Sequence, residues 1–154
     1  MTKSKGELGM LGVSSYKKDY VEECRKAVAA QLSAYRNLIE TARKEAGAGN
    51  KAMASAIGSF TPGYFNSLVL ALDHLFLHRL RTRELKDGNA LNEVRMLCNS
   101  IMEHEQVMTE DTQIKYDPAR SISKIKIGEK ISMDEEKFAR LASGFFDEIE
   151  KKYP

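Results

Sequence analysis

The sequence lacks most of the features from which a function is usually read. It contains no G-x-S-x-G elbow, P-loop, dinucleotide fingerprint or H-E-x-x-H motif. Its two cysteines form neither a CxxC motif nor a close pair, which favours reduced core thiols over a disulfide framework. Lysine and arginine (24) nearly balance aspartate and glutamate (22), and a net charge of +2 indicates no particular partner. These absences assign no catalytic group.

Long apolar runs are also missing. Glycines and Glu7 interrupt the first thirteen residues, so they contain no apolar core of a signal peptide. The charge-free stretch 52–72 carries serines, Thr61, Pro62 and Asn66, which make it too polar to span a bilayer. The sequence therefore predicts a cytoplasmic protein without a membrane segment.

The length and composition indicate one compact domain. A chain of 154 residues with 42% hydrophobic and 30% charged residues can bury a core, and no repeat or linker divides it. Residues 1–13, rich in glycine and lysine, are predicted to be a flexible arm. Residues 14–154 are predicted to form a single helical domain.

A long helix is predicted at the start of this domain. Ser14 or Ser15 offers an N-cap, and apolar residues recur at spacings of three and four as far as Ala42. The helix would end at Gly47–Asn50 and would be about 45 Å long. Because this length exceeds what a small domain needs, we expect part of the apolar stripe to meet a second subunit in a homodimer.

Three further helices follow from capping signals. A short helical piece is expected at 51–58, and Thr61-Pro62 would then open a second long helix that runs to about Leu85. Lys86–Asn89 is a turn signal, after which Asn89 can cap a third helix. Ser132–Glu135 is read as a capping box before a last helix. The apolar face of that helix comprises Phe138, Leu141, Ala142, Phe145, Ile149 and Tyr153.

Residues 109–131 have a different pattern. Apolar and polar residues alternate at 114–116 and 124–127 around Asp117-Pro118, which predicts a small β-ribbon. The expected fold class is therefore mainly α: a four-helix bundle-like domain with a long N-terminal helix and a small β-ribbon before the last helix.

The second long helix carries an unusual set of ionisable residues. Arg79 and Arg83 are predicted to project close to its apolar arc, and a guanidinium cannot shed its charge to enter a core. One hypothesis pairs them internally with acids such as Asp73, Glu93 or Asp147. The other is an anion-binding site. Its candidate residues are Asp73, His78, Arg79, Arg83, Lys86, Asn89 and Arg95, with free amides at the start of the third helix.

Histidines on the same helix suggest a metal site as a separate hypothesis. His74 and His78 are four residues apart, the spacing with which a helix holds one metal ion. His104 on the third helix is the candidate third ligand. The alternative is a polar helix face on which the histidines form ordinary hydrogen bonds. The Glu-x-x-His motif of di-iron bundles is absent.

Basic residues also gather at 79–83 (RLRTR) and on the predicted ribbon at Lys124, Lys126 and Lys130. Such runs usually coat a solvated face, and no helix-turn-helix pattern or set of interleaved aromatics accompanies them. The sequence therefore does not favour nucleic-acid binding, whereas a small anion stays a candidate ligand.

The runs FNSLVLALDHLFLHRLRTRELKDGNALNEVRMLCNSIM and KIGEKISMDEEKFARLASGFFDEIEKKY resemble a family of short helical bacterial proteins, chiefly actinobacterial, with no known activity. The resemblance covers about residues 60–153 and implies a stand-alone cytoplasmic domain, but it indicates no particular activity, cofactor or substrate and leaves the function open. Two residues depart from the family pattern: Leu85, where glycine is expected, and Ala90, where proline is expected.

Two functions remain as expectations. The first is a non-enzymatic helical protein that self-associates or binds a partner through the long first helix. The second is a small-molecule anion or metal site around the second and third helices, with or without catalysis.

Overall fold

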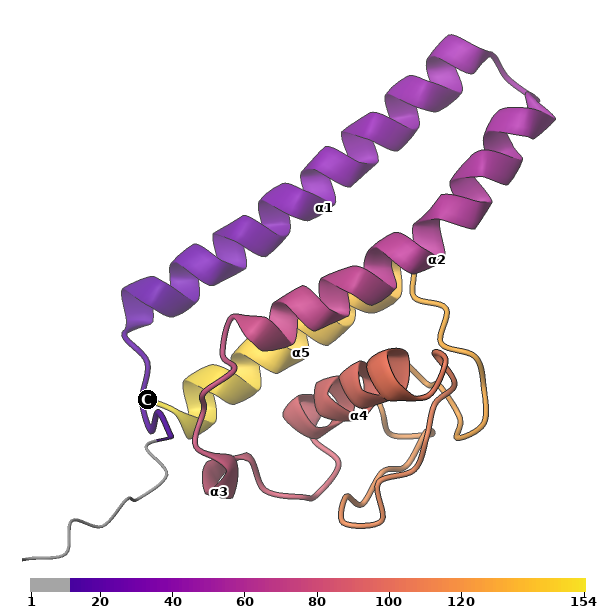
Figure 1. Cartoon of the computed structure of the whole chain (residues 1–154). Coiled ribbons are helices and arrows are strands. Elements are labelled where there is room, and N and C mark those ends of the chain that lie inside the picture. Colours follow the sequence, from indigo (N-terminus) through magenta and orange to yellow (C-terminus); the bar gives the residue numbers. More distant parts are fainter. Residues whose placement is uncertain (1–11) are drawn as a thin grey trace, which may run out of the picture.

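A computed structural model describes residues 12–154, which are mainly α-helical and contain five helices packed together (Figure 1). The predicted mainly α class is therefore confirmed. The helices are α1 (Lys18–Ala46), α2 (Lys51–His74), α3 (Arg81–Glu84), α4 (Ala90–Glu103) and α5 (Glu135–Lys152). The long helices α1 and α2 form an antiparallel hairpin, α5 packs against both of them, and α4 packs against α2 and α5.

The hairpin turn has the residues that the sequence indicates. Gly47 and Gly49 adopt φ values of 88° and 79°, which a side chain would disfavour. Asn50 then caps α2, because its side chain accepts a hydrogen bond from the Met53 amide. At the other end of α1 the predicted serine cap is wrong: the N-cap is Lys17, and its side chain makes no capping hydrogen bond.

Helix α2 is continuous through the residues that were predicted to begin it. The N-cap prediction for Thr61-Pro62 is wrong, because Pro62 lies inside the helix. The Thr61 hydroxyl donates to the Ile57 carbonyl at 2.8 Å and lies 2.7 Å from the Tyr35 hydroxyl of α1. The helix thus passes through a residue that lacks an amide hydrogen, at a point where it contacts α1.

The helix also ends earlier than predicted. It stops at His74, and residues 75–80 form a turn before the single-turn helix α3. Leu85 follows with a φ of 62°, which is unusual for a branched side chain. Asn89 then caps α4 as predicted, since its side chain accepts hydrogen bonds from the amides of Leu91 and Asn92.

Residues 104–134 contain no strand, so the predicted β-ribbon does not form; one isolated antiparallel bridge joins Val107 to Lys130. Buried side chains instead hold the backbone on either side of the predicted strand at 124–127. The Glu93 carboxylate accepts the amides of Ile122 and Ser123, at 2.9 and 2.8 Å. Asn66 accepts the Met133 amide at 3.1 Å. The segment is therefore an irregular loop held onto α4 and α2.

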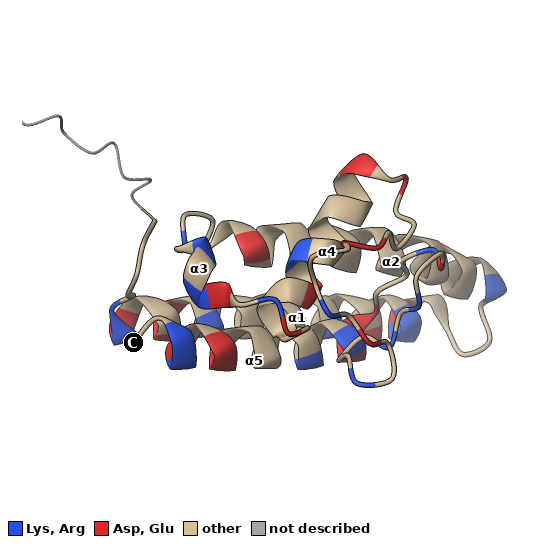
Figure 2. Cartoon of the chain, turned by 90° about the horizontal axis from the view of Figure 1, so that it is seen from below, with Lys and Arg blue, Asp and Glu red and all other residues tan. Residues whose placement is uncertain are grey.

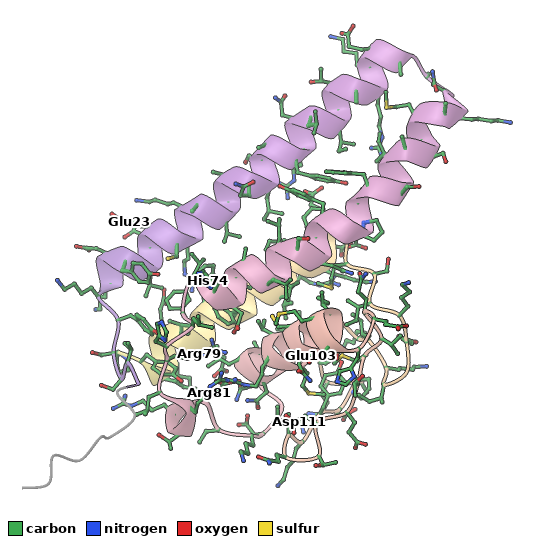
Figure 3. The ribbon with its side chains drawn as sticks, viewed as in Figure 1. Glu23, His74, Arg79, Arg81, Glu103 and Asp111 are labelled. Carbon is green, nitrogen blue, oxygen red and sulfur yellow. The ribbon has the colours of Figure 1, made fainter. Side chains whose placement is uncertain are left out.

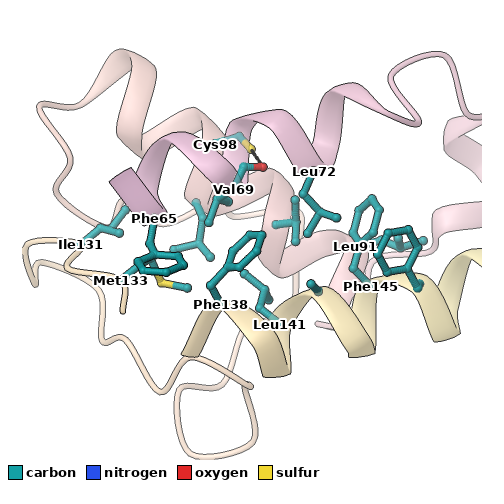
Figure 4. Packing of buried hydrophobic residues seen from close by; sticks show 14 of the residues in the cluster. Phe65, Val69, Leu72, Leu91, Cys98, Ile131, Met133, Phe138, Leu141 and Phe145 are labelled. Atoms are coloured by element: carbon teal, nitrogen blue, oxygen red, sulfur yellow. Dashed lines mark hydrogen bonds between the residues drawn. The ribbon is translucent and has the colours of Figure 1, made fainter. Parts of the chain in front are cut away.

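The core lies between α2, α4 and α5 (Figure 4). The cap of α5 is Asp134, whose side chain accepts from the Lys137 amide, so the capping box was predicted two residues too early. The predicted apolar face of α5 is confirmed as buried. The central buried residues are Phe65, Val69 and Leu72 of α2, Leu91 and Leu97 of α4, and Phe138, Leu141 and Phe145 of α5.

The predicted flexible arm lies outside the described residues except for Gly12 and Val13. Val13 is held at the turn after α2: its amide donates to the His78 carbonyl at 2.7 Å, and its carbonyl accepts from the Leu80 amide at 2.8 Å. Among residues 12–154, no helix combines the length and the apolar character that crossing a bilayer requires.

Candidate functional site

Four ionised side chains form a continuous chain beneath the turn between α2 and α4. Arg79 donates to Asp73 at 2.8 Å and to Glu84 at 3.2 Å, and Glu84 also accepts from the Arg95 Nε at 2.8 Å. The side chains of Arg79 and Glu84 are each only 2% exposed. Such deep burial is tolerated because every charge has an opposite charge in contact with it.

The turn after α2 creates this arrangement. Phe76 lies in this turn with its ring buried, and its carbonyl accepts a hydrogen bond from the Arg79 Nη1 at 3.1 Å. The Arg79 guanidinium also lies 5.5 Å from the centre of the Phe145 ring. One nitrogen, Nη2, has no partner among the described residues. The site is thus built from a helix end, one helical turn and the core.

Burial and charge act against each other in this cluster. Burial by itself lowers the pKa of Arg79, but the carboxylates of Glu84 and Asp73 outweigh it, so the pKa of Arg79 is raised and the guanidinium stays charged. Burial raises the pKa of Glu84, and the Arg79 charge opposes that rise. The internal pairing proposed for Arg79 is therefore present, with Asp73 as the predicted partner and Glu84 as a second one.

The other candidates for the anion site have separate contacts. Arg83 is exposed and donates to the Lys152 carbonyl at 3.1 Å, so it isn't part of the buried cluster. The Lys86 ammonium donates to the Gln113 side chain at 2.6 Å, and the Asn89 side chain is used as the cap of α4.

His78 is exposed and lies in the turn after α2, where its backbone carbonyl accepts from the Val13 amide. The predicted set is thus divided. Asp73, Arg79 and Arg95 come together, while the remaining four candidates have other contacts.

The three histidines proposed as metal ligands are not assembled into a site. His74 is the last residue of α2 (Figure 3). His78 lies in the turn beyond it, and His104 is the C-cap of α4. Since α2 ends at His74, the two nearer histidines do not share a helix face. No group of three or more His, Cys, Asp or Glu side chains within residues 12–154 is placed to hold a metal ion.

Glu84 is the residue of the cluster that sequence reasoning missed. On a helix running to Leu85, Arg79 and Glu84 would point about 140° apart, so no pairing is expected. The break at 75–80 removes that constraint. The one sequence signal for Glu84 is that this acid directly follows the run RLRTR, whose arginines need a negative charge nearby if they are buried.

Two surface grooves flank the cluster and share Arg81 and Arg95. The first is an open groove of about 560 Å³ between α2 and α4, where apolar side chains such as Leu70, Leu77 and Met102 supply most of the wall beside Asp73, His74 and Asn99; we call it the apolar groove. The second is an open groove of about 360 Å³ beneath α3, lined mostly by polar side chains that include Glu84, Lys86, Asn92 and Asp111, together with Leu85 and Ile114; we call it the polar groove. Both volumes lie in the range of small-molecule sites, roughly 300–1,000 Å³.

The two thiols have little nucleophilic character. Burial raises the pKa of Cys98 to about 12, and burial also raises the pKa of Cys24. Because the thiolate is the reactive form, neither cysteine is activated at neutral pH.

No family model, curated protein or solved structure matches this chain. The likeness to short helical bacterial proteins therefore stays a prediction from the residues, and only the geometry of the chain indicates a function.

Proposed function

We propose that this protein acts by self-association, as a non-enzymatic helical protein, and that two copies meet through the α1–α2 hairpin. The observation that carries the proposal is the lack of a core in the distal half of the hairpin. Between Arg36 and Tyr64 only Ile39 and Ile57 are buried, although this stretch contains the ends of two helices. Two helices alone cannot enclose a core, and this half extends beyond α4 and α5 (Figure 1).

One face of α2 has the composition of a helix contact. At 100° per residue, six residues fall on one arc: Ala52, Ala56, Ser59, Phe60, Gly63 and Ser67. All six are exposed and uncharged, and Phe60 is 48% exposed. We call them the α2 strip. Small residues permit close approach of a second helix, and Phe60 provides an apolar anchor that stacks on Tyr64 at 5.3 Å.

The amount of exposed surface supports a partner of ordinary size. The chain exposes 10223 Å², whereas a compact monomer of 17.3 kDa is expected to expose about 7,800 Å². An upper allowance of about 1,700 Å² for residues 1–11 leaves about 8,500 Å² for residues 12–154, which is about 1,100 Å² more than the roughly 7,400 Å² expected for a compact chain of their mass. Each subunit of a standard dimer buries about 800 Å².

A second copy is the occupant that the charges favour. In a two-fold symmetric dimer each surface meets itself, so a charged face would bring like charges together. Acidic and basic residues are interspersed along α1 and α5 (Figure 2), while the α2 strip has none. The predicted interface was the apolar stripe of α1. Four residues of that stripe, Val21, Cys24, Tyr35 and Ile39, are buried within their own chain, and Val28 and Leu32 pack partly buried against the same core, so the proposal moves the interface to α2.

The test is sedimentation velocity of the full chain over a range of concentrations up to about 100 µM, where a dimer of moderate affinity is populated. We expect a dimer, and we expect Ala56→Glu to weaken it by at least about tenfold because two carboxylates would meet across the interface. Alanine-to-glutamate exchange on an exposed helix costs only a few tenths of a kcal/mol, so circular dichroism and thermal melting should be unchanged.

The matched control is Ala30→Glu, which places the same charge on the exposed side of α1, opposite its buried residues. This variant should dimerise like the wild type. A wild-type protein that stays monomeric at the highest concentration would overturn the proposal, as would a dimer that Ala30→Glu disrupts and Ala56→Glu leaves intact.

A further inference from the structure

The two grooves beside the ionised cluster form one amphipathic surface. Arg81 and Arg95 line both of them, so the apolar groove and the polar groove meet at these two guanidinium groups. Arg81 projects from α3, and Figure 3 shows it between the end of α2 and the loop that carries Asp111. The junction is therefore formed by elements from three parts of the chain.

The apolar groove exposes side chains that water disfavours. Its lining includes Leu70, Ala71, Leu77 and Met102, and it lies between α2 and α4. Leu77 is 42% exposed and Met102 is 66% exposed. Several exposed apolar side chains in one groove indicate a binding surface more strongly than the same residues scattered singly.

Arg81 and Lys86 have no carboxylate contact in the described part of the chain. Arg81 is exposed and forms no ion pair there, whereas Lys86 bonds only to the neutral Gln113 side chain. Arg95 does have a carboxylate partner, Glu84, but Glu84 is shared with Arg79. The Arg95 side chain is 25% exposed and can still reach a ligand.

The charges around the junction leave room for one anion. The charged groups that line the two grooves balance, with Arg81, Lys86 and Arg95 against Asp73, Glu84 and Asp111, and the buried Arg79 beneath them adds one positive charge. Asp111 lines the polar groove, where its side chain accepts the Gln113 amide at 2.9 Å. The excess is one positive charge, and among the described residues Arg81 and Lys86 are the cations of this set without a carboxylate contact.

We propose that the joined grooves bind an amphipathic carboxylate, a molecule with an apolar chain and one terminal carboxylate group. The chain would lie between α2 and α4 against Leu77 and Met102. The carboxylate would lie in the polar groove, where Arg81 and Lys86 donate to it; a guanidinium can do so with two parallel hydrogen bonds. This site does not depend on the proposed self-association, because none of its residues belongs to the α2 strip.

Calorimetric titration of the full chain with dodecanoate, below its micelle concentration, tests the proposal. We expect one dodecanoate per chain. Dodecanol lacks the charge, acetate lacks the chain and dodecyltrimethylammonium has the opposite charge, so each should bind at least about tenfold more weakly. The variant Ala56→Glu should bind dodecanoate like the wild type, whether or not the protein dimerises.

Variants with matched controls separate the two halves of the site. Arg81→Ala should weaken dodecanoate binding by about tenfold, whereas Arg83→Ala, two residues along the same helical turn but outside both grooves, should not. Met102→Ser should weaken binding by about threefold, and the comparably exposed Ile127, which lies outside both grooves, should tolerate the same change.

Three results would overturn the proposal. The first is no heat of binding with dodecanoate. The second is equal binding of dodecanoate and dodecyltrimethylammonium, which would mean a purely apolar interaction. The third is an equal effect of Arg81→Ala and Arg83→Ala, which would mean a general influence of surface charge.

Discussion

Removing one member of the buried ion cluster should destabilise the protein nearly as much as removing an interacting pair of them. In Glu84→Gln the side chain keeps its shape but loses its charge, so the guanidinium of Arg79, only 2% exposed, retains Asp73 as its single counter-charge. Breaking a buried ion pair typically costs about 3–5 kcal/mol. Because Asp73 and the Phe145 ring remain, we expect about 3 kcal/mol.

The reciprocal variant, Arg79→Met, leaves Glu84 with Arg95. Since the Arg95 side chain is 25% exposed and hydrated, we expect a slightly smaller loss, about 2–3 kcal/mol. In the double variant both buried charges are gone, so no deeply buried charge is left without a partner. Its loss should fall short of the summed single losses by about 2 kcal/mol, which is the coupling energy of the pair.

Urea unfolding monitored by far-UV circular dichroism measures all four proteins. A loss of 3 kcal/mol would lower the melting temperature by about 6–12 °C in a chain of this size. The control cycle uses Glu22 and Lys26, an i,i+4 pair whose side chains are 65% and 74% exposed, and its coupling should stay below about 0.5 kcal/mol. Additive losses at Arg79 and Glu84 would refute the claim that the two charges stabilise each other.

Two further predictions concern the backbone after α3 and the buried thiol. Leu85→Gly should stabilise the protein by about 1 kcal/mol, because Leu85 adopts a φ of 62° that favours glycine. The control is Leu38→Gly, a change at a similarly exposed residue within α1, which should cost about 1 kcal/mol in the same thermal melt. Burial raises the pKa of Cys98 to about 12 from an ordinary value near 9, so as the pH rises the thiol ionises in the unfolded chain before it does in the folded one. The free energy of unfolding should therefore fall above about pH 9, by at most about 1.4 kcal/mol per pH unit. Cys98→Ala should flatten that decline between about pH 9 and 12, and equal slopes would contradict the assignment.

Local signals predicted the parts of the fold that depend on local interactions. The glycine turn at Gly47–Asn50 and the cap at Asn89 were read correctly, because a side chain or a positive φ satisfies the backbone within a few residues. Thr61-Pro62 carried an equally strong local signal and was misread. Thr61 lies inside a continuous helix and contacts Tyr35, 26 residues away, and no local pattern contains that contact.

The predicted ribbon failed for a related reason. Alternating residues at 124–127 fit a strand, but the backbone amides just before them, at Ile122 and Ser123, are taken by the Glu93 carboxylate. Glu93 had been considered only as a partner for arginine. A buried carboxylate can be satisfied by backbone amides as well as by cations, and the sequence does not distinguish the two.

The run RLRTR illustrates how one motif divides into different environments once the helix ends before it. Arg79 is neutralised under the core by Asp73 and Glu84, so it has no charge to offer a ligand. Arg83 is occupied by a backbone carbonyl of the last helix. Arg81, between them, is exposed without a carboxylate and lies at the junction of the two grooves. An anion that binds this protein should therefore depend on Arg81, although the sequence drew attention to its two neighbours.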